Sequence, residues 1–387
     1  MSTARITFSK RLSPSRALAY DTLVAKIRRN IADLVAQPTT WSWAADGDYS
    51  TWNEGFLDIG NWTTSFFTGM ALIAWSETED EHFIRHVLEL DPLYRAKVTG
   101  HAEDTMHDLG FLYSLYSVAL HKLTGEVRHR ELGLKAAEVL AARFRPEGNY
   151  IRAWGRLDET GTDWDAMAII DCMMNLPLLY WASQQTGDAR FKEIAVRHAD
   201  TTLMCFIRDD DSVFHAYRFD PLTGAPSGGE NYCGFSKDSH WARGTAWAIY
   251  GFAMSYRWTG ERRYLDASLR VARKFLSLLD DEIVPVWDFR LPEDPALHIR
   301  DSSATAIAAC GFQELETLGH ADEAIVAAKE AFIDRLCSPA YLDTDPAVRG
   351  TLKHGQVGNP IQAYTSWGDY YLMEALAREN GMIIPWW

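Results

Sequence analysis

Two aspartates stand where acid–base chemistry could take place, and Asp171 is the more conspicuous. It lies in the segment Ala168–Pro177, whose other residues are almost all apolar. A carboxyl group buried without a counter-charge is costly to ionise, so its pKa rises and it keeps a proton near neutral pH. Such a group can act as a general acid. The alternative interpretation is that Asp171 caps a helix, because Asp is favoured at helix starts.

The second aspartate, Asp108, belongs to the motif His107-Asp108-Leu109-Gly110-Phe111. Two carboxyl groups held close together cannot both ionise easily, so the pKa of one of them rises. Helix N-termini act in the opposite direction, because they stabilise the anion. If the two aspartates are neighbours, we expect one to keep a proton while the other stays charged. Asp108 could also be no more than a helix cap.

An arginine and a histidine are further candidates. Arg243 falls in the first turn of a predicted apolar helix, where a cation is electrostatically unfavourable. An anion should therefore face it, either Asp238 or a carboxylate of a ligand. His215 lies in the preceding connection, where a single histidine is usually solvated. Four other aspartates are expected to cap helices or support the site: Asp165, Asp288, Asp301 and Asp369.

The elements that must position these residues are helices arranged in a repeat. Four times, an apolar helix ends at a glycine turn and an amphipathic helix follows at once, at Gly125, Gly187, Gly260 and Gly319. Outer, polar-faced helices are predicted to start near residues 15, 81, 126, 188, 261 and 320, and inner, apolar helices near residues 63, 108, 172, 240, 302 and 368. An open solenoid could use the same units, but helices that are apolar all round need burial on every side. We therefore predict an all-α (α/α)6 barrel, a six-hairpin toroid that forms one domain over residues 1–387.

In such a barrel the inner helices run parallel, so their N-termini meet at one end. The predicted starts bring together polar and aromatic residues that apolar helices do not need: Trp62, His107, Asp108, Asp171, His240, Trp241, Arg243, Arg300, Asp301, Trp367 and Asp369. Convergence of this kind predicts the active site. Several tryptophans lie in connections that contain Gly and Asp, where their flat rings would suit the apolar faces of sugars.

Composition argues against several other functions. The formal net charge of −15 disfavours nucleic acid or an anionic membrane as a partner. The five cysteines are odd in number and lack paired metal-ligand spacing, which favours reduced thiols in a cytoplasmic protein. We recognise no apolar run of membrane-spanning length and no leader peptide. The sequence motifs of phosphate loops, dinucleotide sites, zinc hydrolases and serine hydrolases are also missing. A monomer or a homodimer is expected.

Several motifs resemble those of the unsaturated glucuronyl hydrolases, glycoside hydrolase family 88. They are His107–Phe111, Ile170–Asn175, Trp241–Trp247, Asp301–Ala304 and Gly368–Tyr371. The resemblance runs from about Trp62 to about Leu376, and it is specific because the motifs follow one another in the right order at plausible spacing. The unsaturated rhamnogalacturonyl hydrolases share the fold and are an alternative.

The resemblance implies a substrate made by polysaccharide lyases, most simply a disaccharide, whose non-reducing end is a 4,5-unsaturated uronic acid. Asp171 would protonate C4 of the enol ether and then activate the water that adds at C5, after which the glycosidic bond falls apart. Asp108 would lie beside the sugar hydroxyls and help to set the pKa of Asp171. The residues implied to bind or shape the sugar are Trp62, Trp154, His215, Arg243 and Trp247. The resemblance implies no metal and no cofactor.

One position departs from the pattern of the family. Relatives often read Thr-His-Gln-Gly before the fourth inner helix, where this chain has Asn231-Tyr232-Cys233-Gly234. Cys233 is a poor hydrogen-bonding substitute for Gln, which leaves the usual substrate open. Lys353, in the loop Gly350–Gly355, could meet the next sugar.

Three other functions fit less well. A conventional inverting glycosidase would use Asp108 and Asp171 as base and acid, with carboxyl groups about 6.5–9.5 Å apart. A sugar epimerase would be expected to use paired histidines at the inner helix starts. A non-catalytic helical scaffold would not need Asp171 within an apolar run.

Overall fold

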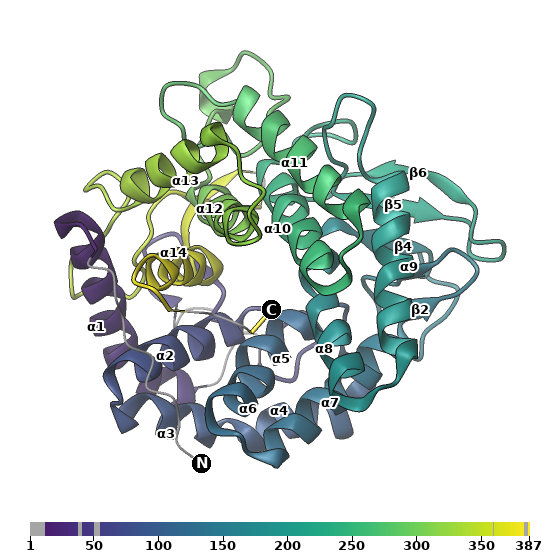
Figure 1. Ribbon diagram of the computed structural model, residues 1–387, viewed down its shortest axis with the longest axis horizontal. Helices are drawn as coiled ribbons and strands as arrows, with labels where there is room; N and C mark the ends of the chain where they lie inside the picture. Colours follow the sequence, from purple (N-terminus) through teal and green to yellow (C-terminus); the bar gives the residue numbers. More distant parts are fainter. Residues whose placement is uncertain (1–11, 38–40, 50–54, 359, 383–385) are drawn as a thin grey trace.

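Two concentric rings of helices make up the computed structural model, which describes residues 12–37, 41–49, 55–358, 360–382 and 386–387 (Figure 1). The outer ring consists of α1 (Pro14–Ala36), α3 (Glu81–Glu89) with α4 (Asp91–Thr99), α7 (Val127–Ala142), α9 (Ala189–Cys205), α11 (Arg262–Ser277) and α13 (Glu323–Leu336). The inner ring consists of α2 (Thr64–Thr78), α5 (Leu109–Tyr113) with α6 (Ala119–Thr124), α8 (Leu176–Thr186), α10 (Ala242–Thr259), α12 (Ser302–Thr317) and α14 (Ser366–Glu379). The ring closes because α14 packs against both α12 and α2. The predicted (α/α)6 barrel is confirmed.

The two rings differ in how their helices are buried. Every residue of α2 from Thr64 to Ala74 and of α12 from Ser302 to Leu315 is buried. In α13, by contrast, the buried residues recur at helical spacing: Ile325, Lys329, Phe332, Ile333 and Leu336. A helix surrounded on all sides and a helix with one buried stripe are the two patterns that the sequence distinguishes.

Three of the predicted turn glycines end inner helices. Gly125, Gly187 and Gly260 follow α6, α8 and α10 with φ angles of 74°, 75° and 73°. This left-handed conformation carries little cost for glycine and is strained for most other residues. Each glycine therefore fixes the point at which an inner helix turns into the next outer one.

Two inner helices depart from the predicted regular starts. Asp171 does not open an α-helix; it lies in a 3-10 turn, Ile170–Met174, that follows a short strand, and α8 begins only at Leu176. The second inner helix is interrupted between α5 and α6 by a π-helical segment, Ser114–Val118. The outer helix predicted from residue 81 is also followed by a separate helix, α4, because Pro92 suits the first turn of a new helix.

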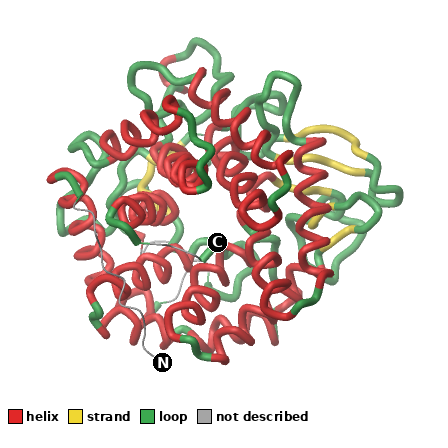
Figure 2. Tube along the Cα trace, viewed as in Figure 1, coloured by secondary structure: helices red, strands yellow, loops and turns green. Residues whose placement is uncertain are grey.

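Short strands occupy the connections that lead into the inner helices. They form three antiparallel sheets: β1 (Trp43–Ala44), β8 (Ile361–Thr365) and β7 (Gly355–Val357); β2 (Phe144–Arg145) and β3 (Tyr150–Ile151); and β4 (Met167–Ile169), β5 (Ala216–Phe219) and β6 (Pro226–Glu230). In Figure 2 the strands of the second and third sheets gather at the right edge of the ring. Strands of two to five residues are too short to show an alternating pattern, so they are hard to recognise from the sequence.

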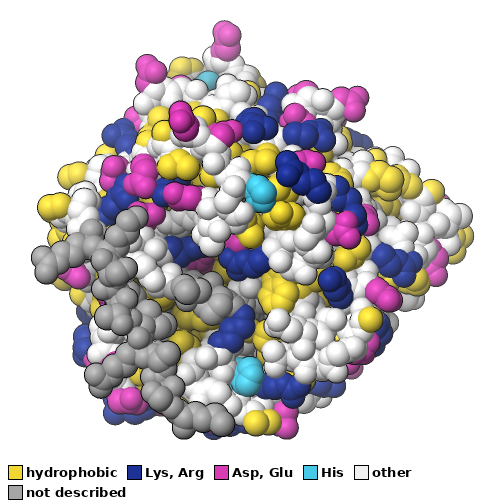
Figure 3. Space-filling view, viewed as in Figure 1, with side chains coloured by type: hydrophobic (Ala, Val, Ile, Leu, Met, Phe, Trp, Pro, Cys, Tyr) yellow, Lys and Arg dark blue, Asp and Glu magenta, His cyan; other side chains and the backbone are white. Residues whose placement is uncertain are grey.

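The surface mixes charges of both signs. In Figure 3, acidic side chains are interspersed with basic ones over the face that is shown. Within the described ranges, no helix combines the length and apolar character needed to cross a membrane.

Gly110 marks a close approach between two inner helices, and its replacement tests the packing. A Cβ atom at Gly110 would lie 2.3 Å from the Cα atom of Asn175 and 2.7 Å from its carbonyl oxygen. Because backbone atoms cannot move aside cheaply, we expect Gly110→Ala to lower the free energy of unfolding by about 1–3 kcal/mol. Urea unfolding followed by circular dichroism measures this change.

Gly100→Ala is the matched control. Its Cβ atom would make only an ordinary contact, at 3.6 Å from the carbonyl oxygen of Ala96, so we expect a change within about 0.5 kcal/mol. Equal stabilities for the two variants would contradict the packing described for Gly110.

Candidate active site

A cavity of about 190 Å³ opens where the inner helices begin. Its lining consists of Gly60, Trp62, Met106, His107, Asp108, Trp154, Ile169, Asp171, His215, Cys233, Trp241 and Arg243. Seven of the nine residues named as candidates from the sequence are therefore brought together here. The exceptions are Trp247 and Lys353.

Asn175 links the segments that carry the two aspartates. Its side-chain oxygen accepts a hydrogen bond from the backbone N–H of Phe111 at 2.8 Å, and its side-chain nitrogen donates to the carbonyl oxygen of Asp171 at 3.2 Å. Asn175 precedes α8 but makes no side-chain capping bond there. Its side-chain amide therefore joins two inner helices and does not cap α8.

Asp108 is a buried carboxyl group and Asp171 is a largely enclosed one, with a side chain that is 16% exposed. Asp108 precedes α5 without a side-chain capping bond, so the capping interpretation is wrong for this residue. Burial and the nearby charge of Asp171 raise the pKa of Asp108 to about 8, against the opposing effects of Arg143 and Asn175. Burial raises the pKa of Asp171 to about 7, although the cation of Arg243 acts in the other direction. Together the two groups keep a proton near neutral pH.

The Oδ2 atom of Asp171 is poised for a ligand. It is buried and has no hydrogen-bond partner within the described part of the chain. A buried carboxyl oxygen without a partner is unfavourable for folding alone, so its retention indicates a functional use. The same atom lies 3.9 Å from Nε2 of His215.

His215 is held as a neutral hydrogen-bond donor. Its Nδ1 atom accepts a hydrogen bond from the backbone N–H of Tyr232 at 3.0 Å, which places the ring proton on Nε2, toward Asp171. Burial and the charge of Arg243 lower the pKa of His215 to about 3. Its backbone carbonyl accepts a hydrogen bond from the N–H of Ile170 at 2.9 Å, so β5 and the turn that carries Asp171 are fixed to each other.

Arg243 is paired inside the protein. Its Nη1 atom donates to Oδ2 of Asp301 at 2.6 Å and to the carbonyl oxygen of Gln356 at 2.8 Å. Asp301 also caps α12, through a bond from the N–H of Ser303. The sequence suggested Asp238 or a ligand as the anion; the structure gives Asp301, because the next inner helix begins beside the first turn of α10. The guanidinium lies over the rings of Trp241 and Trp367, at 4.6 Å and 5.3 Å from their centroids.

The two candidates outside the cavity have other contacts. Trp247 is fully buried in α10 and packs against Phe111 and Tyr371, with ring centroids 5.2 Å and 5.4 Å apart. The ammonium group of Lys353 donates to the carbonyl oxygen of Pro339 at 2.8 Å. Neither side chain lines the cavity, because each is engaged elsewhere.

Sequence reasoning left several lining residues without a role. His107 and Trp241 stood in motifs that were recognised, and His107 has its Nε2 atom 3.4 Å from Oδ1 of Asp108. Gly60, Met106 and Ile169 carry no chemical group that marks them. Only their positions next to candidate residues could have pointed to them. Among the described residues, no group of three or more His, Cys, Asp or Glu is arranged to hold a metal ion.

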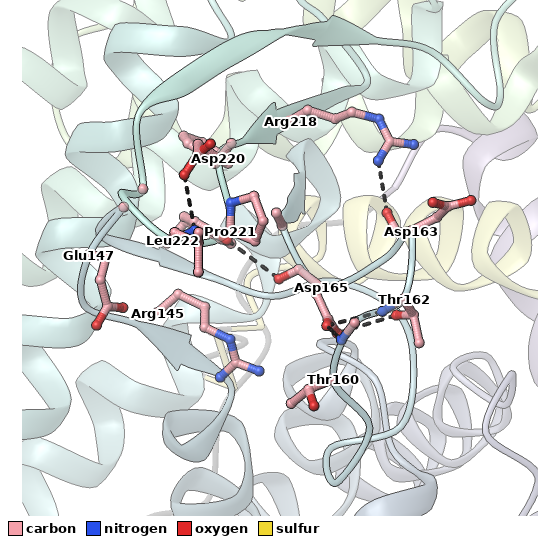
Figure 4. Close-up of a pocket in the computed structure, with 16 residues that line it drawn as sticks. Arg145, Glu147, Thr160, Thr162, Asp163, Asp165, Arg218, Asp220, Pro221 and Leu222 are labelled. Atoms are coloured by element: carbon pink, nitrogen blue, oxygen red, sulfur yellow. Dashed lines mark hydrogen bonds between the residues drawn. The ribbon is translucent and has the colours of Figure 1, made fainter.

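A second, larger pocket of about 590 Å³ lies at the edge of the molecule, between the β2–β3 hairpin, the loop of residues 160–165 and the β5–β6 hairpin (Figure 4). The carboxylate of Asp165 turns toward its own loop and accepts bonds from the N–H and the hydroxyl of Thr162, both at 3.2 Å. Arg218 reaches across to donate to the carbonyl oxygen of Asp163 at 2.8 Å. These groups hold the loop and are not arranged as an acid–base pair.

Comparisons with known proteins identify the family of this chain. The sequence model of Glycosyl Hydrolase Family 88 matches residues 36–378. The unsaturated glucuronyl hydrolase of Bacillus sp. strain GL1 is 34% identical over 338 residues, which cover 85% of this chain and 89% of that protein. The unsaturated chondroitin disaccharide hydrolase of Streptococcus pyogenes serotype M1 is 37% identical over 340 residues, with 86% and 84% covered.

Solved structures of unsaturated glucuronyl hydrolases also resemble this chain. The crystal structure of the Bacillus sp. GL1 enzyme superposes with a TM-score of 0.85 at 32% identity and covers 94% of this chain and 96% of that one. A variant of the unsaturated glucuronyl hydrolase of Streptococcus agalactiae, complexed with dGlcA-GalNAc6S, superposes with a TM-score of 0.75 at 27% identity, with 98% of both chains covered.

The raised pKa of Asp171 predicts how stability depends on pH. Between the ordinary carboxyl pKa near 4 and a folded-state pKa of about 7, the folded protein binds more protons than the unfolded one, so stability falls as pH rises. Asp171→Asn removes this penalty. We expect the variant to exceed the wild type by on the order of 2–4 kcal/mol at pH 8, with a gain that disappears toward pH 4.

Thermal unfolding of both proteins across this pH range measures the difference. Asp158→Asn is the control, because a hydrogen bond from Arg156 lowers the pKa of Asp158, so its replacement should bring no gain at pH 8. A constant difference between Asp171→Asn and the wild type at all pH values would contradict the raised pKa.

Proposed function

The chain belongs to glycosyl hydrolase family 88, and on this premise we propose how its cavity removes a 4,5-unsaturated uronic acid from the non-reducing end of oligosaccharides. The enzyme is a glycosidase that acts by hydration of the C4=C5 enol ether. The observation that carries the proposal is the pair of buried aspartates with raised pKa values in one cavity. We treat the barrel as one catalytic domain.

Asp171 supplies the proton in this proposal. Its carboxyl group, whose pKa burial raises to about 7, protonates C4, and the positive charge at C5 is shared with the ring oxygen. The Asp171 carboxylate then takes a proton from the water that adds at C5. The resulting hemiketal opens between C5 and the ring oxygen, and the hemiacetal left at C1 releases the second sugar. One water molecule is consumed, and Asp171 ends in its starting state.

Neighbouring residues favour both protonation states of Asp171. Asp108 shares the proton of the pair, because the two carboxyl groups resist being ionised together. Arg243 lowers the pKa of Asp171 and so stabilises the carboxylate that remains after proton transfer. The Nε2–H of His215, 3.9 Å from Asp171, can donate to a sugar hydroxyl or to the attacking water.

Flat and uncharged walls complete the proposed sugar site. Trp62 is stacked on Trp367 with ring centroids 5.0 Å apart, and Trp62 and Trp154 both line the cavity. Burial raises the pKa of Cys233 to about 12, so its side chain is a neutral thiol. A thiol is a weak hydrogen-bond donor, and we propose that Cys233 shapes the wall instead of fixing a hydroxyl group.

We propose an unsaturated disaccharide as the substrate of this enzyme. This choice rests on relatives: one is named as a chondroitin disaccharide hydrolase, and another was solved with dGlcA-GalNAc6S. Lys353 has no role in the proposal, because its ammonium group is bound to Pro339.

Replacement of Asp171 tests the proposed mechanism. Asp171→Asn cannot deliver or accept the proton, so kcat should fall by roughly 10²–10⁴-fold, measured as loss of the ultraviolet absorbance of the conjugated double bond. Asp188→Asn is the matched control: Asp188 caps the outer helix α9, and Asn caps as well as Asp, so its activity should stay at the wild-type level. Full activity of a folded Asp171→Asn protein would show that another residue is the acid.

A further inference from the structure

Two exposed aromatic rings lie beside the catalytic cavity. Among the large hydrophobic side chains that are exposed in the described part of the chain, two are aromatic: Trp164, 37% exposed, and Tyr232, 41% exposed. Their rings lie 5.9 Å apart, and each also contacts Trp154, which lines the cavity. Exposed aromatic rings that gather at one place mark a binding surface.

We propose that Trp164 and Tyr232 form the binding surface for the sugar that follows the unsaturated uronate. We call these two residues the aromatic platform. The assignment rests on the proposed function, because it needs the uronate to occupy the cavity. The assignment concerns the second sugar alone, so the aromatic platform and the proposed function can be tested separately.

The platform is continuous with the cavity. Trp154 is the shared element: its ring centroid lies 5.1 Å from that of Trp164 and 5.2 Å from that of Tyr232, at steep interplanar angles of 83° and 74°. Tyr232 is also tied to His215 through its backbone N–H, and it precedes Cys233, which lines the cavity. A chain of sugars that leaves the cavity past Trp154 therefore meets these rings next.

The Tyr232 side of the platform is fixed by Arg218. One guanidinium nitrogen donates to the hydroxyl of Tyr232 at 2.9 Å, and the other donates to the carbonyl oxygen of Asp163, the residue before Trp164, at 2.8 Å. Figure 4 shows the guanidinium of Arg218 directed at Asp163. A single side chain thus joins the two segments that carry the rings.

Buried arginines hold the loop that carries Trp164. Arg152 donates to Oδ1 of Asp165 and to the carbonyl oxygen of Glu159, both at 2.8 Å. Arg143 donates to the carbonyl oxygens of Trp154 and Gly155, at 3.0 Å and 2.9 Å. Rings that are already fixed lose little conformational freedom when a ligand binds, which favours stacking.

The charges around the platform favour an uncharged sugar. Asp158 and Glu159 are about half exposed, and Asp163 is exposed beside Trp164. The nearby cations are already paired: Arg156 with Asp104 and Asp158, and Arg218 with Glu230. A sulfate group on the second sugar would approach the exposed carboxylate of Asp163, for which no ion pair is found among the described residues. The occupant is therefore assigned as a neutral pyranose whose apolar face lies on the ring of Trp164, with the ring of Tyr232 beside it at an interplanar angle of 67°.

Trp164→Ala tests the platform with two substrates. One is an unsaturated, unsulfated disaccharide, and the other is the methyl glycoside of the same unsaturated uronate, which has no second sugar. We expect KM for the disaccharide to rise about 3- to 10-fold with little change in kcat, and KM for the methyl glycoside to stay unchanged. A wild-type enzyme that consumes neither substrate would refute the proposed function itself.

Two further variants separate the ring from other effects. Tyr232→Phe keeps the ring and removes only the bond to Arg218, so its KM should stay within about twofold of the wild-type value. Leu222→Ala removes an exposed apolar side chain from the neighbouring β5–β6 hairpin and should leave both substrates unaffected. If Trp164→Ala behaves like Leu222→Ala toward the disaccharide, or raises KM for both substrates equally, the platform is refuted.

The sulfated disaccharide tests the charge assignment. The wild-type enzyme should show a higher KM for a disaccharide that carries a sulfate on its second sugar than for the unsulfated one. An equal or lower KM for the sulfated compound would overturn the assignment of a neutral occupant.

Discussion

The structure depends on two carboxyl groups that are kept out of water at the starts of neighbouring inner helices. Asp108 is buried and the side chain of Asp171 is only 16% exposed, and the cation that acts on Asp171, Arg243, is already bound to Asp301. Burial raises both pKa values more than Arg143 and Arg243 lower them, so the pair keeps a proton. Gly110 leaves room for the backbone of Asn175, and the Asn175 side chain accepts a hydrogen bond from Phe111, so the two segments are held close together. Folding energy is thus used to keep a carboxyl group protonated that would ionise in water.

Much of this arrangement could be predicted from the sequence. The alternation of fully apolar and one-sided helices gave the barrel, and the parallel direction of the inner helices placed Asp108, Asp171 and Arg243 at one end. The local geometry could not be predicted in the same way. Asp171 lies on a 3-10 turn after β4 because that strand pairs with β5 over three residues, which is too short to leave a sequence pattern.

Long-range contacts account for the other differences. Arg243 was expected to face either Asp238, which is near in sequence, or a carboxylate of a ligand, and in the structure it binds Asp301 at the start of the next inner helix. Trp247 looked like a sugar-binding residue by its motif, yet it is fully buried against Phe111 and Tyr371. Motifs identify the helices that meet at the site, whereas the choice of partner and the direction of a side chain depend on residues far away in the chain.

The central claim is that Asp171 delivers a proton to C4 from a fixed side of the sugar. Hydration of an unsaturated disaccharide in D2O, followed by NMR during the first turnovers, tests it most directly. The account predicts one deuteron at C4 on a single face of the ring, appearing in step with the loss of ultraviolet absorbance and the release of the second sugar. A released product without deuterium at C4, or with equal labelling of both faces, would contradict it.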